Sequence, residues 1–388
     1  MKFNKWTVAL AAVGAVSLTS VAQAEEKMML GSRSELTSTT ISGYVDASAQ
    51  WNLKNNGTLA LPQYAFGGAA KADGFNLNVV QLTVAKALDE SEWSAGYRAD
   101  LWFGPDAVTL ATQGAGGDLA IRQAYVALRT PVGNGIDWKL GVFDTIVGYE
   151  TLESGNNPNF TRSYGFSIEP TTHTGLLATY RFCDAVSASL GVVNSFGPQI
   201  NTKAQATGQS ETFKTYMGSI ALTAPSDWGW VAGSSLYAGI ISGYDANVVA
   251  PGNDGHRQHY YLGATVSTPV TGLKVGAALD FNHIDNAVTT QTADQQVYGI
   301  YASFQATEKL SLHTRGEYVV SDQENGRLGA DIYEVTVTAQ YDLWKNVISR
   351  AEFRWDHTLD ERNGTGFGVA TNPRKDALLL AANVIYKF

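Results

Sequence analysis

The last twelve residues, Ala377 to Phe388, read ALLLAANVIYKF. Every second residue of this stretch is apolar, whereas the positions between them are mixed in polarity. The apolar series consists of Leu378, Leu380, Ala382, Val384, Tyr386 and Phe388. Because successive side chains of a β-strand point to opposite faces, this period of two predicts a strand with one continuous apolar face. Such strands occur in soluble β-sandwiches and in membrane-spanning β-barrels, so the rest of the chain decides between these folds.

The same alternation recurs along the chain, most clearly in residues 273–282, 333–343 and 347–356. These segments reach about ten residues or more, which is longer than the usual strand of a soluble sandwich. Their apolar faces begin or end on aromatic residues, among them Trp51, Trp93, Phe103, Trp138, Phe182, Trp228, Phe281, Phe304, Tyr318 and Trp355. Two aromatic belts that bound an aliphatic band are typical of strands crossing a bilayer.

The predicted connections between strands alternate strictly between short and long. Short ones lie near residues 89, 131–135, 183–184, 225–227, 269–272, 307–308 and 344–345. Long ones lie near residues 54–73, 104–118, 149–172, 198–211, 245–256, 285–294, 322–330 and 360–374. This alternation is typical of an all-β, transmembrane antiparallel β-barrel with short periplasmic turns and long external loops. We therefore expect about sixteen strands in a single domain over residues 40–388, with both termini on the periplasmic side.

The beginning of the chain has the pattern of a secretory signal peptide. Lys2 and Lys5 precede an apolar stretch rich in small residues, and Ala22-Gln23-Ala24 fits a cleavage site. We expect residues 1–24 to be removed, and the polar residues 25–39 to form a short periplasmic lead-in. No other stretch approaches the length of about 18 apolar residues that a membrane-spanning helix requires. The expected location is the bacterial outer membrane.

The composition agrees with a barrel that hides its apolar surface in alternate positions. The chain contains 39 Gly, 18 Tyr, 15 Phe and 9 Trp, yet its mean hydropathy is only −0.11. The net charge of −9 argues against nucleic acid as a partner, since phosphates require a basic surface. A single cysteine, Cys183, excludes a disulfide framework within the chain.

Four stretches in residues 119–182 resemble a known family. They are IRQAYVAL (residues 121–128), WKLGVFDT (138–145), SGNNPNFTRSYGF (154–166) and HTGLLATYRF (173–182). Together they resemble the OmpL-like family of β-barrel porins, and the layout of the rest of the chain is similar as well. The resemblance implies a bacterial outer-membrane channel of the sixteen-strand type.

A barrel of this size is too wide for its own side chains to fill, so the sequence predicts an aqueous lumen. The expected function is a porin for passive diffusion of small hydrophilic solutes. A substrate-selective channel for sugars or anions stays open, because the inward positions carry mixed charge. A non-conducting barrel that acts as an adhesin or an envelope enzyme is the alternative from another class.

The third long connection, Tyr149 to Thr172, is the longest and is the candidate pore constriction. If it folds inward, its acidic residues Glu150 and Glu153, together with Arg162, would lie opposite basic residues of the wall. The candidate wall residues are Arg98, Arg181, Arg315, Arg350 and Arg354, with Arg122 in an unclear register. Opposed charges across a gap would create a transverse field that orients polar solutes. An external, solvated loop and local ion pairs within the wall are the alternatives.

The sequence indicates no catalytic residues, no cofactor and no metal site. The six histidines, His173, His256, His259, His283, His313 and His357, show no ligand spacing and no nucleophile pattern. The expected partners are outer-membrane lipid, small hydrophilic solutes and the barrel-assembly machinery, with a homotrimer suggested by analogy to porins. Phe388 and Tyr386 are the candidate assembly signal, because the resemblance to closing strands of outer-membrane barrels rests on them.

Overall fold

The structure is a computed structural model that describes residues 39–53, 71, 73–113, 117–205, 212–245, 256–286, 291–323, 331–359, 367–369 and 372–388. The expected signal peptide and nearly all of the expected lead-in lie outside these residues.

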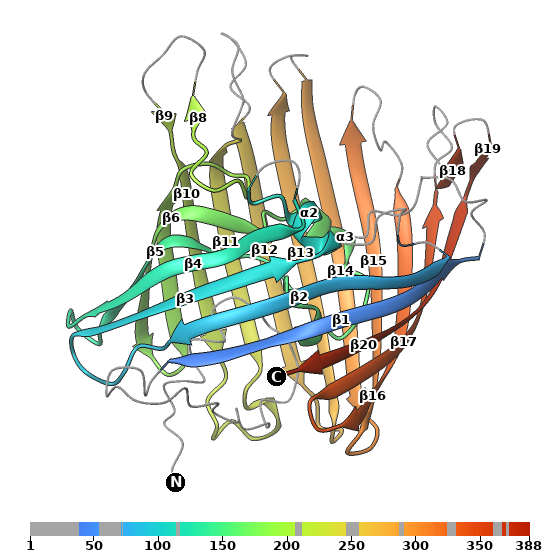
Figure 1. The fold of residues 1–388 in the computed structure, drawn as a ribbon, viewed down its shortest axis with the longest axis horizontal. Helices are drawn as coiled ribbons and strands as arrows, with labels where there is room; N and C mark the ends of the chain where they lie inside the picture. The colour runs from blue at the N-terminus through green and yellow to red at the C-terminus, as the bar shows by residue number, and fades with distance from the viewer. Residues whose placement is uncertain are drawn as a thin grey trace.

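Sixteen strands of the described chain form a closed antiparallel barrel, as the sequence predicts (Figure 1). Each strand pairs with its neighbours in sequence order, and β1 pairs with β20 to close the sheet. Closure is required in a bilayer because unpaired strand edges would leave backbone groups without partners. The strands are β1 (Thr40–Asn52), β2 (Gly74–Lys86), β3 (Ser94–Phe103), β4 (Leu119–Thr130), β5 (Ile136–Asp144), β6 (Thr172–Cys183), β7 (Val186–Val193), β10 (Thr215–Thr223), β11 (Ser235–Tyr244), β12 (His256–Ser267), β13 (Leu273–Asn286), β14 (Gln291–Gln305), β15 (Leu310–Gln323), β16 (Ile332–Trp344), β17 (Val347–Thr358) and β20 (Asp376–Lys387).

Small additional elements lie in the long connections. Two hairpins, β8 (Ala204–Gln205) with β9 (Thr212–Phe213) and β18 (Phe367–Val369) with β19 (Asn372–Arg374), lie at the upper rim in Figure 1. The short helices are α2 (Pro105–Leu110), η2 (Ser154–Asn156) and α3 (Tyr164–Ile168), while η3 (Gly229–Val231) lies in a connection on the opposite rim. No helix in the described part of the chain is long and apolar enough to cross a membrane.

The two faces of the strands differ as the alternation predicts. Val337 on the outer face is 50% exposed, whereas its neighbour Thr338 on the inner face is fully buried. Large apolar side chains are exposed on the outside, including Trp51, Trp93, Phe103, Phe182, Trp228, Phe304, Tyr386 and Phe388. Such a distribution suits a surrounding hydrocarbon layer, and most of the buried charged residues lie inside the barrel.

The described ends of the chain lie near the rim that carries the short turns. Phe388 exchanges backbone hydrogen bonds of 2.9 and 3.0 Å with Gly43, so the last residue completes the barrel closure.

One predicted connection is wrong in its bounds. Strand β13 ends at Asn286 and β14 begins at Gln291, so the connection between them has four residues. The sequence predicted a longer connection, over residues 285–294. The rim ends of these strands carry polar residues at most positions, and the apolar alternation therefore gives no signal there.

Candidate functional site

The connection between β5 and β6, residues 145–171, folds into the barrel and is called loop 3 below. A hydrogen bond of 2.9 Å from the Thr145 N–H to the Thr171 carbonyl closes its neck. Most of its side chains are buried, which an external solvated loop would not show. The structure therefore places the candidate segment inside the barrel, and the external alternative does not apply.

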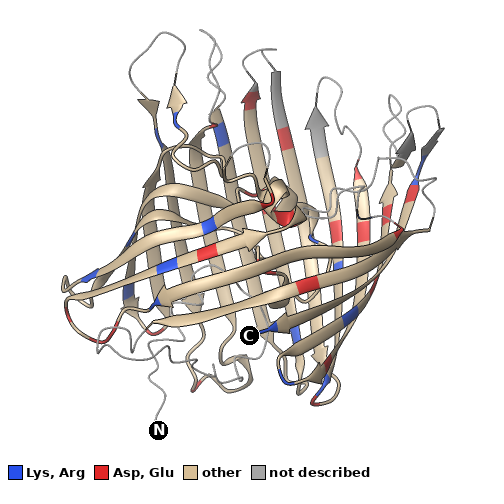
Figure 2. Cartoon of the chain, in the orientation of Figure 1, with Lys and Arg blue, Asp and Glu red and all other residues tan. Residues whose placement is uncertain are grey.

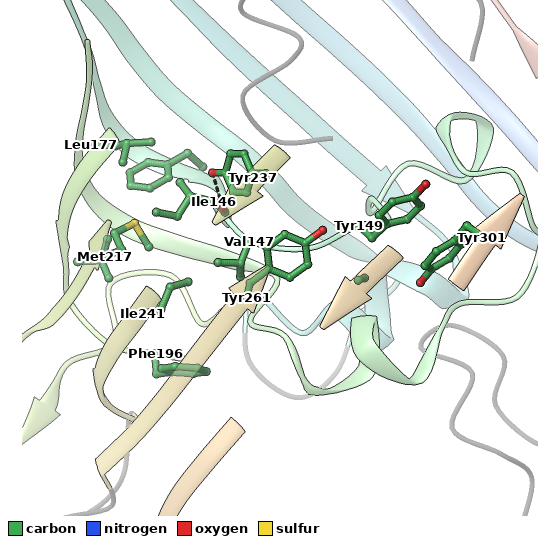
Figure 3. Packing of buried hydrophobic residues seen from close by; sticks show 13 residues of the cluster. Ile146, Val147, Tyr149, Leu177, Phe196, Met217, Tyr237, Ile241, Tyr261 and Tyr301 are labelled. Carbon is green, nitrogen blue, oxygen red and sulfur yellow. Dashed lines mark hydrogen bonds between the residues drawn. The ribbon is translucent and has the colours of Figure 1, made fainter. Parts of the chain in front are cut away.

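The first part of loop 3 packs on an apolar wall of the lumen (Figure 3). Ile146, Val147 and Tyr149 belong to one buried cluster with side chains of β5–β7, β10–β14 and the connection after β7. The other members are Phe143, Leu177, Val193, Phe196, Met217, Tyr237, Ile241, Tyr261, Ala278 and Tyr301. The Tyr149 ring stacks on Tyr301 at 3.9 Å between centroids. The Tyr237 hydroxyl donates a hydrogen bond to the Ile146 carbonyl, so the buried backbone is satisfied as well.

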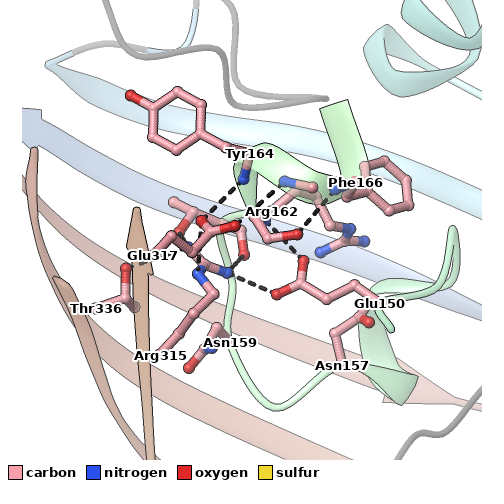
Figure 4. Close-up of polar contacts among 12 residues, drawn as sticks. Glu150, Asn157, Asn159, Arg162, Tyr164, Phe166, Arg315, Glu317 and Thr336 are labelled. Carbon is pink, nitrogen blue, oxygen red and sulfur yellow. Dashed lines mark hydrogen bonds and ion pairs between the residues drawn. The ribbon is translucent and has the colours of Figure 1, made fainter. Parts of the chain in front are cut away.

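The second part of loop 3 contacts a charged wall on β15–β17, centred on Arg315 (Figure 4). Arg315 Nη1 lies 2.7 Å from Glu150 Oε1 of the loop, and Nη2 lies 3.1 Å from Glu334 Oε1 of β16. Nη1 also donates to the Thr161 carbonyl at 3.0 Å. The three charged side chains are 0% exposed, so each charge is compensated by direct partners rather than by water.

Wall carboxylates also bind the backbone of loop 3. Glu317 on β15 accepts hydrogen bonds from the Tyr164 and Gly165 N–H groups at 2.9 and 3.2 Å. Glu352 on β17 accepts from the N–H groups of Phe160 and Thr161, the second at 2.9 Å. Two of these amides begin α3 and the other two precede it, so none has a carbonyl partner within a helix, and the wall supplies the acceptors that they need. Hydrogen bonds to charged acceptors are about twice as strong as neutral ones.

A second charged cluster holds loop 3 near β3–β5. Arg122 Nη1 lies 2.6 Å from Glu153 and 3.0 Å from Asp100, and Nη2 binds Asp144. Arg98 Nε lies 2.9 Å from Asp100 Oδ2, and its Nη2 lies 3.3 Å from Glu153. Burial of Glu153 opposes its ionisation, but Arg122 and Arg98 outweigh this effect and lower its pKa to about 2. The loop carboxylate is therefore firmly ionised at neutral pH.

The structure brings most of the predicted site residues together on loop 3 and the wall that it touches. Arg350 donates to the Ser154 carbonyl at 3.1 Å, and Arg354 donates to the Arg162 carbonyl at 2.7 Å while pairing with Asp356 at 2.8 Å. Arg162 donates to the carbonyls of Leu152 and Phe160, each at 3.1 Å. The opposite charges thus touch directly, whereas the sequence predicts a gap between them.

Arg181 is a correction to the candidate set. It lies at the end of β6 beside the short turn, and its Nη2 is 3.0 Å from Asp184. Loop 3 joins β6 at Thr172, at the other end of the strand, so Arg181 lies at the rim opposite to the loop connection.

Sequence reasoning missed the wall carboxylates Glu317 and Glu352 as partners of loop amides. Their inward positions were readable from the alternation, but their partners are backbone groups that no residue pattern reveals. Arg122 had an unclear register because the pairing of β3 with β4 shifts between Asp100 and Leu101. This irregularity lets two consecutive residues, Arg122 and Gln123, be buried inside the barrel.

Charged residues lie on the strands as well as in the connections (Figure 2). Within the described residues, no group of three His, Cys, Asp or Glu side chains is arranged to hold a metal ion. The Cys183 thiol is free and exposed.

Comparison of the fold with solved structures finds porins and channels. The anion-selective porin from Comamonas acidovorans superposes with a TM-score of 0.61 and 12% sequence identity, covering 90% of this chain and 99% of that chain. The outer membrane channel DcaP of Acinetobacter baumannii gives a TM-score of 0.60 at 11% identity, covering 90% and 97%. The trimer form of OmpT from Vibrio cholerae gives 0.58 at 12% identity, covering 90% and 99%. At such identities these similarities establish the fold alone.

The sequence comparisons are more specific. No curated protein matches the chain. Residues 38–388 match the family described as "Putative beta-barrel porin-2, OmpL-like", which covers the entire barrel domain. The chain therefore belongs to this family of OmpL-like β-barrel porins.

Proposed function

We propose that this protein is an outer-membrane porin through which small hydrophilic solutes diffuse passively, and that loop 3 sets the width of its pore. The observation that carries the proposal is the seating of loop 3 inside a closed sixteen-strand barrel. A barrel of this strand number encloses more space than its own side chains fill, and a loop inside it narrows the path.

The charged partners in the lumen support a polar path. Arg98 is 33% exposed, and Asp144 and Glu153 are 28% and 18% exposed, so polar groups of the β3–β5 cluster face open space inside the barrel. Hydrated solutes can exchange water contacts for contacts with such groups, whereas apolar solutes gain nothing from them.

Planar-bilayer recording of the purified protein tests the proposal. We expect discrete, long-lived conductance steps that grow linearly with voltage over a moderate range. Liposome swelling should slow steadily as sugars of increasing size are offered. A folded barrel that produces no conductance steps would contradict the function, and saturable uptake of one sugar would favour the selective channel.

Export and assembly form a second part of the proposal. Residues 1–24 are a cleaved signal peptide, and Phe388 and Tyr386 are the signal that the barrel-assembly machinery reads. Both side chains are 50% exposed, Tyr386 on the outer face of β20 and Phe388 directly after this strand, so a partner can reach them. Phe388→Ala should lower the amount of protein in the outer membrane while the conductance of the assembled fraction stays unchanged. Equal outer-membrane amounts of variant and wild type would argue against this role.

We further propose that the chain assembles as a homotrimer in the outer membrane, as in the trimer form of the Vibrio cholerae protein of similar fold. Chemical cross-linking in native membranes should give a trimer band. A monomer alone, under conditions that cross-link a known porin trimer, would contradict this state.

A further inference from the structure

Two carboxyl groups face each other at the neck of loop 3. Glu169 follows the last turn of α3, where the chain leaves the lumen, and its side chain hydrogen-bonds to Asp280 on β13. Asp280 is 2% exposed. Two ionised carboxylates in direct contact repel each other, whereas a pair that shares one proton forms a hydrogen bond.

Both acids fit tightly against the loop backbone. A Cβ atom built on Gly148 would lie 2.3 Å from Glu169 Oε2, and one built on Gly165 would lie 2.6 Å from Asp280 Oδ2. Gly148 also has a φ of +115°, which side chains other than glycine rarely adopt. Glycine at these two positions allows the carboxyl pair to join the entering and leaving segments of the loop to the wall.

Within the part of the chain that the structure describes, the groups around the pair are a histidine, acidic side chains and an arginine that is already shared. On β12, His259 Nε2 lies 3.1 Å from Asp280 Oδ1, and the buried Tyr261 lies close by. The loop contributes Glu150 and the β15 wall contributes Glu317, both acidic. The nearby cation Arg315 is shared by Glu150, Glu317 and Glu334. Burial, followed by the proximity of Asp280, raises the pKa of Glu169 well above its ordinary value.

We propose that Glu169 and Asp280 share one proton while loop 3 is seated, and that loss of this proton at alkaline pH releases the neck of the loop and widens the pore. In this step hydroxide removes the O–H proton from the pair, water forms, and two carboxylates remain in contact. Because the seated state binds the proton more tightly than the released state, seating is most stable below the ordinary glutamate pKa. The seating of loop 3 weakens as the pH rises through the raised pKa of Glu169. The inference rests on the proposed porin function, since it regulates the same pore.

Single-channel conductance measured between about pH 6 and pH 9.5 tests the inference, because a glutamate of ordinary pKa is already ionised over this range. We expect the wild-type conductance to rise with pH. Glu169→Gln keeps a hydrogen-bond donor beside Asp280 without an ionisable proton, so its conductance should stay low and lose the pH dependence. Asp280→Asn should behave in the same way. Glu92→Gln, an exposed site in the turn between β2 and β3, serves as the control and should respond like wild type.

Thiol labelling separates this inference from the channel function. Ser154 lies within loop 3 and is 5% exposed, so a cysteine placed there in a Cys183→Ser background should react slowly at low pH and faster at high pH. Because every thiol reacts faster as the pH rises, the rate at position 154 is divided by the rate of a cysteine placed at the exposed Ser91. A folded barrel without conductance at any pH would contradict the porin function, while labelling would still report whether loop 3 is seated. Corrected labelling and conductance that are both independent of pH would overturn the inference.

Discussion

Two of the surfaces that hold loop 3, the apolar wall and the charged wall on β15–β17, use different physical means. The apolar wall contacts residues 146–149 through packed aliphatic and aromatic side chains, whereas the charged wall contacts residues 150–165 through ion pairs and carboxylate–amide hydrogen bonds. Apolar packing is tolerant of small changes in position, but a buried ion pair is costly as soon as one partner is lost. We infer that the apolar wall supplies a general attraction and that the charged wall fixes the position of the loop.

The largest effect is expected at the centre of the charged wall. Arg315→Met leaves Glu150, Glu317 and Glu334 buried without their shared cation, which should cost about 3–5 kcal/mol of unfolding free energy. Denaturant titration of the refolded barrel in detergent measures this loss. As a matched control, Arg181→Met removes a pair at the exposed rim and should cost about 1 kcal/mol or less. Equal losses of unfolding free energy in the two variants would mean that the buried ion pairs of the charged wall contribute no more than an exposed pair.

An intermediate effect is expected at Glu153 in the β3–β5 cluster. Glu153→Gln should cost about 1–3 kcal/mol, because Arg122 keeps Asp100 and Asp144 as partners. The same contact should respond to acid. With the pKa of Glu153 lowered to about 2 from an ordinary value of 4.5, its contribution is full above pH 4.5 and is lost as the pH falls toward 2. Acid titration of unfolding in wild type and Glu153→Gln checks this, and identical acid profiles would rule the contribution out.

The smallest effect is expected in the apolar wall. Ile241 is fully buried, and Ile241→Val removes one methylene from the cluster, at a cost of about 0.5–1.5 kcal/mol. Because neighbouring side chains can adjust, the loop should stay seated and the conductance should not change. Denaturant titration and bilayer recording of the same preparation measure both quantities. A change in conductance at this modest cost would show that the apolar wall also fixes the loop position.

The sequence predicted the barrel well because a bilayer imposes a simple rule on every strand. Outward residues such as Val337 must be apolar, inward residues such as Thr338 need not be, and the period of two follows directly. The sequence did not decide whether loop 3 folds into the barrel or stays outside, because a polar loop with Glu150 and Glu153 suits either a charged wall or solvent.

The partners within the site were harder to predict. Arg315 and Glu150 are 165 residues apart, and their contact depends on how a long loop crosses the lumen. The pairing of Arg354 with Asp356 was readable because the two lie on one face of one strand. Arg350 has the same local spacing to Glu352, yet its guanidinium binds the Ser154 carbonyl of the loop instead. Contacts to backbone groups carry no residue signature, and they therefore stay invisible in a single sequence.

The central claim is that the seated loop limits the flow of ions, and single-channel conductance tests it most directly. Residues 154–159 contact Arg350, Thr338 and Lys387 of the wall, and replacing them with two glycines removes these contacts without touching a strand. Since the narrowest segment dominates the resistance of a pore, we predict a clear increase in single-channel conductance over wild type in the same salt. An unchanged conductance from a fully folded variant would contradict the account, because the loop would then lie away from the path that ions take.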